Sequence, residues 1–440
     1  MKLAIAALAA LAAAASAQAA PLDPAAARAA IDAETAKHWS ELDTLYKDIH
    51  SHPELGHHEV RTAALLAAKM RALGLTVTEH VGGTGVVAIL KNGPGPTVMV
   101  RTELDALPME EKTGLPYASR VQFTGEDGRT TFVAHSCGHD NHMAWWVGTA
   151  EALIALKAQW SGTVMFIAQP AEETVGGASG MIKDGLFTRF PKPDFGFAAH
   201  VSNLPTGLVI VKDGGYNSNA DAIDILFKGR GAHGSMPSAS IDPIVEAAHF
   251  VTDVQTVVSR QKDAGTFGVI TVGAFQAGTV GNIIPDHAEV KLTLRSFTPE
   301  VRQLLLDGVT RTANAAAAMA DAPPPVITSE GAAAAVINDH DLAVKVDATL
   351  AAAGGDKAVF MPASAPGISA SEDYSEFIIA GVPSLYMSVG GYDPAVLEGY
   401  KAKGEPVPTN HSPFFAPDHD AAIPTGIRTL TLAVLTVTAK

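Results

Sequence analysis

Apolar residues recur at changing intervals along the chain, and the interval predicts which segments are helices and which are strands. From residue 25 to about 214, segments with helical spacing alternate with short runs rich in β-branched residues. We expect helices at 25–50, 60–73, 142–158 and 178–186, and strands at 75–80, 85–90, 97–101, 163–168 and 194–199. Alternating strands and helices are typical of a layered α/β fold with a largely parallel sheet.

The pattern changes after Gly214, where strands begin to follow one another directly. We expect strands at 221–228, 267–274 and 288–295 and helices at 242–260 and 299–319. This order predicts a small α+β unit that ends at the proline-rich run 321–325. The sequence therefore predicts an α/β catalytic domain with a mixed, largely parallel sheet, interrupted by a smaller α+β satellite domain. The catalytic domain comprises residues 20–214 and 326–440, and the satellite domain residues 215–325.

The first residues have the pattern of a signal peptide. Met1-Lys2 is followed by an apolar run, Leu3–Ala15, and by the small-x-small cleavage site Ala17-Gln18-Ala19. The apolar run is shorter than the ~20 residues that a membrane-spanning helix needs. We therefore expect residues 1–19 to be removed and the mature protein to be periplasmic or secreted. The formal net charge of −15 argues against nucleic acid and against anionic membranes as partners, but it does not select a substrate.

The chain has a single cysteine, Cys137, within the run His135–Asp140. One cysteine cannot form a disulfide within the chain, so in an oxidising compartment it is either buried and inert or a metal ligand. The thiolate of Cys137 and the imidazole of His139 can both reach one divalent ion, because Gly138 lets the backbone turn between them.

Further potential ligands stand at strand ends or in loops. Glu172 and Glu173 follow one predicted strand, where an α/β sheet presents its ligands. His200 ends the next predicted strand, and His411 lies in a polar loop near the C-terminus. Each of them alone is compatible with an ordinary turn or an exposed loop. Two adjacent carboxylates beside a metal can divide their work, one coordinating the ion and the other carrying a proton.

Other enzyme classes fit the chain poorly. Residues 229–234 match the G-x-G-x-x-G dinucleotide fingerprint, but the next predicted helix begins only near Asp242, too late for the last glycine to open it. The sequence contains neither the G-x-S-x-G elbow of a serine hydrolase nor the H-E-x-x-H pattern of a zincin metalloprotease.

Longer stretches of the sequence make a specific resemblance. They are HPELGHHE (52–59), RTELDALPMEEKTGLPYAS (101–119), HSCGHDNHMA (135–144), QPAEETVGGA (169–178), AAHVSN (198–203), KGRGAHGSMP (228–237), GTVGNIIPD (278–286) and NHSPFF (410–415). On these the chain resembles the amidohydrolase branch of the aminoacylase and carboxypeptidase-G2 metallopeptidases, which includes hippurate hydrolases and auxin–amino-acid conjugate hydrolases. The stretches follow the family's order over nearly all of the mature chain.

The resemblance implies a role for individual residues. Two divalent ions would be held by Cys137, His139, Glu173, His200 and His411. Glu172 matches the general acid/base, and Asp105 matches an acidic residue that orients a ligand. His233, in the satellite domain, would contact the scissile group across a dimer interface. Asn282 and Arg295 match positions near the substrate carboxylate; an arginine is a suitable carboxylate clamp, but Arg295 also fits an ordinary exposed strand position.

These observations predict a metal-dependent amidohydrolase that cleaves the amide bond of N-acyl-amino acids or short peptides, as a homodimer or larger homo-oligomer. A thiolate beside imidazoles favours zinc, while the family also uses manganese, cobalt or nickel. The alternatives are a dipeptidase or carboxypeptidase of the same fold and, more remotely, a non-catalytic periplasmic metal- or peptide-binding protein. The sequence departs from the family at Glu103, where aspartate is usual, and at Met143, and these changes bear on the substrate more than on the reaction. Met143 and Trp145-Trp146 either narrow the site or pack the helix, and packing is favoured.

Overall fold

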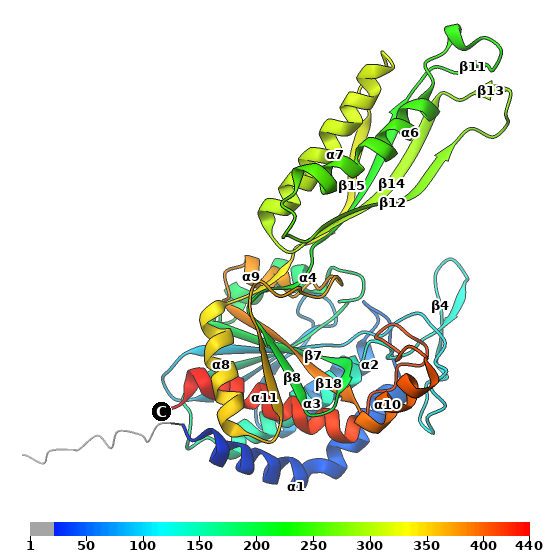
Figure 1. Ribbon diagram of the computed structural model, residues 1–440. Helices are drawn as coiled ribbons and strands as arrows, with labels where there is room; N and C mark the ends of the chain where they lie inside the picture. The colour runs from blue at the N-terminus through cyan, green and yellow to red at the C-terminus, as the bar shows by residue number, and fades with distance from the viewer. Residues whose placement is uncertain (1–21) are drawn as a thin grey trace, which may run out of the picture.

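The computed structural model describes residues 22–440, and it shows a main lobe from which a narrower satellite lobe projects (Figure 1). The main lobe comprises residues 22–217 and 336–440, and the satellite lobe residues 220–333. The predicted signal peptide, residues 1–19, lies outside the described residues.

The main lobe is built on an eight-stranded sheet. Its strands, in spatial order, are β1 (Thr76–Thr78), β2 (Val86–Asn92), β6 (Gly162–Gln169), β3 (Thr97–Glu103), β7 (Phe195–Pro205), β18 (Ser384–Tyr392), β8 (Leu208–Lys212) and β17 (Lys357–Met361). The central strands β6, β3, β7 and β18 run parallel, as do β8 and β17 at one edge, and the other neighbours are antiparallel. The predicted α/β fold with a mixed, largely parallel sheet is confirmed.

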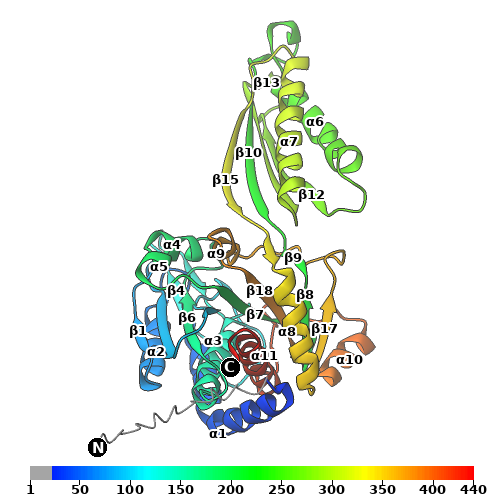
Figure 2. The same cartoon turned by 90° about the vertical axis from the view of Figure 1, so that its left-hand side faces the viewer.

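Helices cover both faces of this sheet because its central strands are apolar on both sides. One face packs against α1 (Pro24–Ser51), α2 (Val60–Ala72), α3 (His139–Ala155), α8 (His340–Ala353) and α11 (His419–Thr438), as Figure 2 shows. The other face packs against the short helices α4 (Gly177–Lys183), α5 (Leu186–Arg189) and α9 (Ser375–Ile379). The main lobe is completed by α10 (Pro394–Lys403) and the small hairpin β4 (Gln122–Thr124) and β5 (Thr130–Phe132).

Helix α11 is long and apolar enough to cross a membrane by length and composition. It lies in the interior of the main lobe, with 72% of its most apolar window buried. Its apolar composition therefore matches that of a core helix packed against α1, α3 and the sheet.

The satellite lobe contains a four-stranded antiparallel sheet with two helices on one face. Its strands are β12 (Gly268–Ala277), β14 (His287–Ser296), β10 (Ala220–Lys228) and β15 (Val326–Ala333), and its helices are α6 (Pro243–Asp253) and α7 (Pro299–Met319). Strand β15 pairs with β10 although it follows the proline-rich run, so this sheet extends beyond residue 325. The two connections to the main lobe run side by side as β9 (Gly214–Asn217) and β16 (Val336–Asn338).

Several element boundaries differ from the sequence-based expectation, each for a local reason. Helix α3 begins at His139 rather than at residue 142, because Gly138 turns the chain with φ 93° directly after Cys137. The helix expected at 178–186 is broken into α4 and α5 by Gly185, which has φ 88°. The helix expected at 242–260 ends at Asp253 and is followed by a π-helical turn, Val257–Gln261.

Candidate active site

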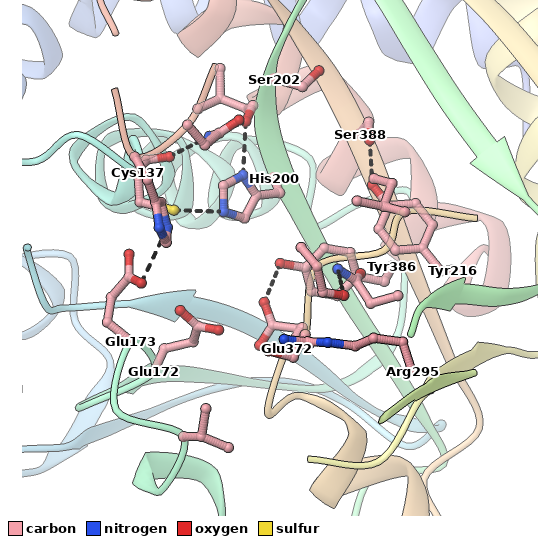
Figure 3. A pocket seen from close by; sticks show the side chains of 18 residues that line it. Cys137, Glu172, Glu173, His200, Ser202, Tyr216, Arg295, Glu372, Tyr386 and Ser388 are labelled. Carbon is pink, nitrogen blue, oxygen red and sulfur yellow. Dashed lines mark hydrogen bonds and ion pairs between the residues drawn. The ribbon is translucent and has the colours of Figure 1, made fainter. Parts of the chain in front are cut away.

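The five predicted metal ligands come from different segments that meet at one edge of the main sheet. Figure 3 shows Cys137, Glu173 and His200 among them. Glu173 follows the carboxyl end of β6, and His200 lies within β7. Cys137 and His139 flank Gly138 at the start of α3, and His411 lies in the loop between α10 and α11. Parallel strands present their carboxyl ends at the same edge, which is why residues far apart in sequence converge here.

The ligand atoms form two groups that share the thiol of Cys137. Cys137, His139 and His200 have donor atoms that all lie within 4.8 Å of one another, and so do Cys137, Glu173 and His411. The Sγ of Cys137 lies 3.4 Å from Nε2 of His200, and Nε2 of His411 lies 3.3 Å from Oε2 of Glu173. Because Cys137 belongs to both groups, these residues could hold two neighbouring divalent ions.

The histidine rings are oriented so that free nitrogens face this cluster. His139 donates its Nδ1–H to the backbone carbonyl of Asp105 at 2.8 Å, and His200 donates its Nδ1–H to the carbonyl of Val201 at 2.8 Å. Within residues 22–440, the buried Nε2 of His139 and Oε1 of Glu173 have no hydrogen-bond partner. Buried polar atoms are rarely left unpaired, and imidazoles held by a second hydrogen bond are typical of metal ligands. The donor set therefore fits divalent metal ions.

The charges around the cluster also favour a cation. Burial, followed by the carboxylates of Glu173 and Glu172, raises the pKa of the Cys137 thiol well above its usual value. Burial lowers the pKa of His139, but its contact with Asp105 and the nearby carboxylates raise this pKa to about 10. Both shifts reflect an excess of negative charge, which a divalent ion would offset while letting Cys137 bind as a thiolate.

Asp105 lies directly behind the ligands. Its Oδ2 accepts the backbone N–H of Glu173 at 2.9 Å, and its own carbonyl accepts the His139 ring proton. Asp105, which was expected to orient one ligand, thus contacts both Glu173 and His139. Its hydrogen bond to His139 is made by the backbone carbonyl rather than by the carboxylate.

The backbone around the ligands adopts conformations that are rare for residues with a side chain. Ala171 and Val175, on either side of the Glu172–Glu173 pair, have φ of 50° and 53°, and His411 has φ 67°. Such left-handed residues cost free energy and are concentrated at functional sites, where they aim side chains. Here they turn the two carboxylates and the loop imidazole toward the same cluster.

Glu172 lies beside the ligands, with Oε2 3.8 Å from Nε2 of His139. Burial raises the pKa of Glu172 well above its usual value, and the carboxylates of Glu372 and Glu173 raise it further. A carboxyl with this environment readily holds a proton near neutral pH, which is what a proton carrier needs.

A cavity of about 320 Å³ opens onto the ligands. Its other walls include Val175, Tyr216, Asn217, Arg295, Ile368, Glu372, Tyr386 and Ser388. Arg295 comes from β14 of the satellite lobe, and its buried Nη1 has no hydrogen-bond partner among the described residues. The predicted substrate-binding arginine therefore reaches the same cavity as the metal ligands, from the other lobe.

His233 and Asn282 are not brought to this cavity within one chain. His233 belongs to β11 (Ala232–His233), which pairs with β13 (Ile283–Ile284) at the outer end of the satellite lobe (Figure 1). The N–H of Gly234 donates to the carbonyl of Asn282 at 2.8 Å, so the two predicted residues are neighbours of each other. Both are exposed at that end, away from the metal ligands.

A buried ionic network beside the site was not anticipated from the sequence. Arg101 is 1% exposed and contacts the carboxylates of Glu103, Glu372 and Asp373. Tyr386 donates its hydroxyl proton to Glu372 at 2.6 Å. Glu372 and Asp373 lie in a stretch with no motif around it, so only the fold reveals that they belong to the site.

Glu103, the position that departs from the family, supports a further histidine. His142 donates Nδ1–H to Glu103 at 2.9 Å, and its Nε2 accepts the N–H of Val201 at 2.9 Å. These two bonds fix the ring in its neutral form next to His200, and burial lowers the pKa of His142 well below its usual value. The spacing of three residues from His139 was a usable signal, because it places both rings on one helix face.

Comparison with known proteins decides the family. The family model described as peptidase family M20/M25/M40 matches residues 99–436. The chain belongs to peptidase family M20/M25/M40.

Its relatives in this family are hydrolases of amide bonds by name. The chain is 39% identical to a hippurate hydrolase of Campylobacter jejuni over 60% of this chain and 66% of that protein. It is 32% identical to thermostable carboxypeptidase 1 of Saccharolobus solfataricus over 85% of this chain and 90% of that protein. It is also 36% identical to an N-acetylcysteine deacetylase of Bacillus subtilis, over 65% of this chain and 73% of the relative.

A solved M20 structure shares the architecture. The crystal structure of a dinuclear metal-binding peptidase of the M20 family from Bacillus subtilis superimposes with a TM-score of 0.73 at 28% identity, covering 90% of this chain and 98% of that one. The predicted family, the enzymatic nature of the chain and its reaction class, hydrolysis of amide bonds with divalent metal ions, are confirmed at this level.

Proposed function

We propose that this M20 hydrolase releases an amino acid from an N-acyl-amino acid or a short peptide, with Glu172 as its general acid/base. The observation that carries the proposal is that Glu172, four of the five predicted metal ligands (Cys137, Glu173, His200 and His411) and Arg295 line a single cavity. A proton carrier, an electrophilic centre and a cation for a carboxylate are the parts that hydrolysis of such an amide needs.

The protein's own residues support each part of the reaction. When bound, divalent ions supply Lewis-acid polarisation of the amide carbonyl and lower the pKa of the attacking water. Glu172 accepts the proton that this water loses as it adds to the carbonyl carbon, and then donates it to the leaving nitrogen. Arg295 binds the carboxylate of the amino-acid portion, which holds the scissile bond over the ligands.

The names of the relatives support this substrate class, and they point to two kinds of substrate within it. Hippurate and N-acetylcysteine, the substrates in the names of two relatives, are N-acyl-amino acids, whereas a carboxypeptidase acts on peptides. Both kinds of substrate carry a carboxylate next to the scissile amide, which suits Arg295 in either case. Val175, Tyr216 and Ile368 make part of the cavity wall apolar, which favours a substrate with an apolar acyl group over one with a charged acyl group.

The ligand types favour zinc as the metal. One thiolate, three imidazoles and a carboxylate are donors that zinc binds well, whereas magnesium and calcium prefer oxygen alone. Each ion would keep an open position toward the cavity, as catalytic zinc sites do.

We also propose that the working enzyme is a homodimer or a larger homo-oligomer. His233 lies at the outer end of the satellite lobe, far from the ligands of its own chain (Figure 1). A partner chain would bring its own His233 over this cavity, where an imidazole can stabilise the developing oxyanion of the substrate. Export through a cleaved signal peptide remains a proposal as well; the N-terminal sequence of the mature protein tests it.

Two measurements test the reaction. A panel of N-acyl-amino acids and dipeptides is assayed with and without a strong chelator and with zinc or manganese added back. We expect chelation to abolish hydrolysis and the metal to restore it, because the oxyanion then loses its principal stabilisation. Activity untouched by chelation would overturn the metal-dependent mechanism.

The second measurement separates Glu172 from its neighbour Glu173. Glu172→Gln should lower kcat by a factor on the order of 10² to 10⁴ and leave the metal content unchanged, because only the proton carrier is removed. Glu173→Gln should instead lower the metal content. Full turnover in Glu172→Gln would contradict the assigned role. If neither the wild type nor the variants hydrolyse any substrate of the panel, a non-catalytic binding protein is favoured.

A further inference from the structure

A second cluster of ligand-type side chains lies on the helical face of the main lobe, remote from the catalytic cavity. It is formed by His38 and Glu41 of α1 and Glu151 of α3, whose donor atoms all lie within 4.8 Å of one another. Glu151 is near the C-terminal end of α3, whereas the catalytic ligand His139 is its first residue. Helices α1 and α3 pack against each other along this face (Figure 1).

Glu151 is the side chain that sets this cluster apart from an ordinary acidic patch. It is only 8% exposed, and its buried Oε2 has no hydrogen-bond partner among the described residues. Its Oε1 points toward the ring of His38, 3.8 Å from Nδ1, which is too long for a hydrogen bond. Leaving a carboxylate buried and unpaired is strongly unfavourable, so a missing partner is indicated.

His38 is oriented as a metal-binding histidine is. Its Nε2 lies 3.0 Å from Oε1 of Glu34, one turn earlier in α1, so the opposite nitrogen, Nδ1, faces Glu151. A carboxylate that holds the far nitrogen of an imidazole fixes its tautomer and strengthens the near nitrogen as a ligand. Glu34 is held in turn by Lys37 at 3.0 Å.

The charge of the cluster is strongly negative. Glu34, Glu41 and Glu151 surround the imidazole of His38. Besides His38, the positive charge that acts on Glu151 is that of Lys69 in α2, which makes no hydrogen bond to Glu151 within residues 22–440. Burial, reinforced by the charge of Glu41, raises the pKa of Glu151 to about 7 although His38 lowers it. A divalent cation would relieve this repulsion.

We propose that His38, Glu41 and Glu151 form a further metal site, for one zinc-like divalent cation, that fastens α1 to α3. Ligand distances of about 2.1 Å at a tetrahedral ion place neighbouring donor atoms roughly 3.4 Å apart, so the observed separations need only small side-chain movements. One imidazole and two carboxylates suit zinc, whereas calcium and magnesium prefer oxygen alone. Water completes the coordination on the exposed side, where Glu41 lies.

The test counts zinc in the full-length protein and three variants. Each protein is loaded with Zn²⁺ alone, freed of weakly bound ion by gel filtration, and analysed for zinc per chain. Glu41→Gln and Glu151→Gln should each hold one ion fewer than the wild type. Asp48→Asn is the matched control: it also removes a carboxylate from α1, but one that pairs with Arg61 outside the cluster, and it should hold the wild-type number.

The outcome is decided by the count together with the thermal stability. Glu41 is exposed, so Glu41→Gln should fold normally and have the same Tm as the wild type in the presence of chelator. Added zinc should raise the Tm of the wild type more than that of Glu41→Gln. Glu34→Gln should weaken zinc binding at this site by about 10-fold or more, because the imidazole loses its orientation. Equal zinc content in the wild type, Glu41→Gln, Glu151→Gln and Asp48→Asn would show a simple His38–Glu151 ion pair and overturn the proposal.

Discussion

Arg295 connects the two lobes at the point where the substrate is proposed to bind. It is carried by a strand of the satellite lobe, yet it lines the cavity that contains the metal ligands of the main lobe. Its buried Nη1 lacks a partner among the described residues, and a substrate carboxylate would supply one.

Replacing Arg295 by glutamine should therefore raise KM for substrates with a free carboxylate. A hydrogen bond to a charged group contributes roughly 1.5–3 kcal/mol, which corresponds to a loss of about 10- to 100-fold in kcat/KM. The control is the same substrate with its carboxylate converted to an amide: the wild type should discriminate against it, and Arg295→Gln should not. Equal discrimination by both enzymes would remove Arg295 from the carboxylate site.

The predicted metal ligands each sit in a short recognisable motif, which is why the sequence alone could propose them. Cys137, His139 and Glu173 are flanked by glycine and proline residues whose turns the chemistry needs. Glu372 has no such context, and Arg101 is one residue of a buried strand, so neither stood out. Arg101 lies in β3 and Glu372 in the loop before α9, and only the tertiary fold brings them together.

Helix α3 begins at the predicted metal ligand His139, and its packing against α11 holds it in place. Gly426 of α11 lies against the ring of Trp145, so closely that a Cβ at Gly426 would be 2.0 Å from Cε3 of the indole. Both helices are buried around this contact, where the surrounding side chains leave little room to move.

Gly426→Ala should destabilise the protein by about 1–3 kcal/mol, because the added methyl group forces the indole or the helix to shift. Urea unfolding measures the change. The control is Gly399→Ala in α10, where a Cβ meets nothing within 4 Å and removal of a helical glycine should stabilise the protein by up to about 1 kcal/mol. If the two variants are equally stable, close packing of α3 on α11 is not what positions the helix.

A buried histidine network joins α1 to α3 and to the loop that contains Glu111. Nδ1 of His50 lies 2.6 Å from Asp140, and its Nε2 lies 3.1 Å from Glu111. Burial lowers the pKa of His50, but the hydrogen bonds to Asp140 and Glu111 outweigh it and raise the pKa to about 9. The folded protein therefore binds this proton more tightly than the unfolded chain does.

The stability that His50 contributes should be complete below its ordinary pKa of 6.5 and should be lost as the pH rises through about 9. The shift corresponds to roughly 3 kcal/mol at most. The free energy of unfolding, measured from pH 6 to pH 10, should fall over this window in the wild type and less steeply in His50→Gln. His249→Gln, which alters an exposed histidine of α6, should follow the wild type; identical slopes in all three proteins would contradict the assignment.

Helices were easier to anticipate than the satellite edge strand. Helix α7 (Pro299–Met319) begins and ends at the predicted residues, because Thr298 caps it and proline occupies its first turn. Strand β15 was missed because it follows a proline-rich run that is typical of a linker, and its pairing with β10 is a contact between segments about a hundred residues apart.

The separation between His233 and the metal ligands makes a prediction about the assembled molecule. If His233 acts on the cavity of a partner chain, His233→Ala and Glu172→Gln are each inactive alone but complementary when mixed. Random reassociation of a dimer should restore about a quarter of the wild-type activity, because half of the dimers are mixed and each has one intact site.

A chain that carries both His233→Ala and Glu172→Gln should show none of the activity recovered by mixing the two single variants. Analytical ultracentrifugation of the wild type gives the oligomeric state independently. A monomeric, fully active protein would sink the proposal that His233 acts in trans, and activity of His233→Ala alone would remove this residue from the reaction.

The sequence by itself determined the class of fold and the family, and it predicted a set of metal ligands, because helical spacing, turn glycines and short motifs are local properties of the chain. Only the tertiary structure decided how these parts are related. It placed Arg295 in the cavity and His233 outside it, and it gathered Arg101, Glu103 and Glu372 into one buried network. These relations depend on strand order and on the direction in which the satellite lobe projects, both of which arise from contacts between distant segments.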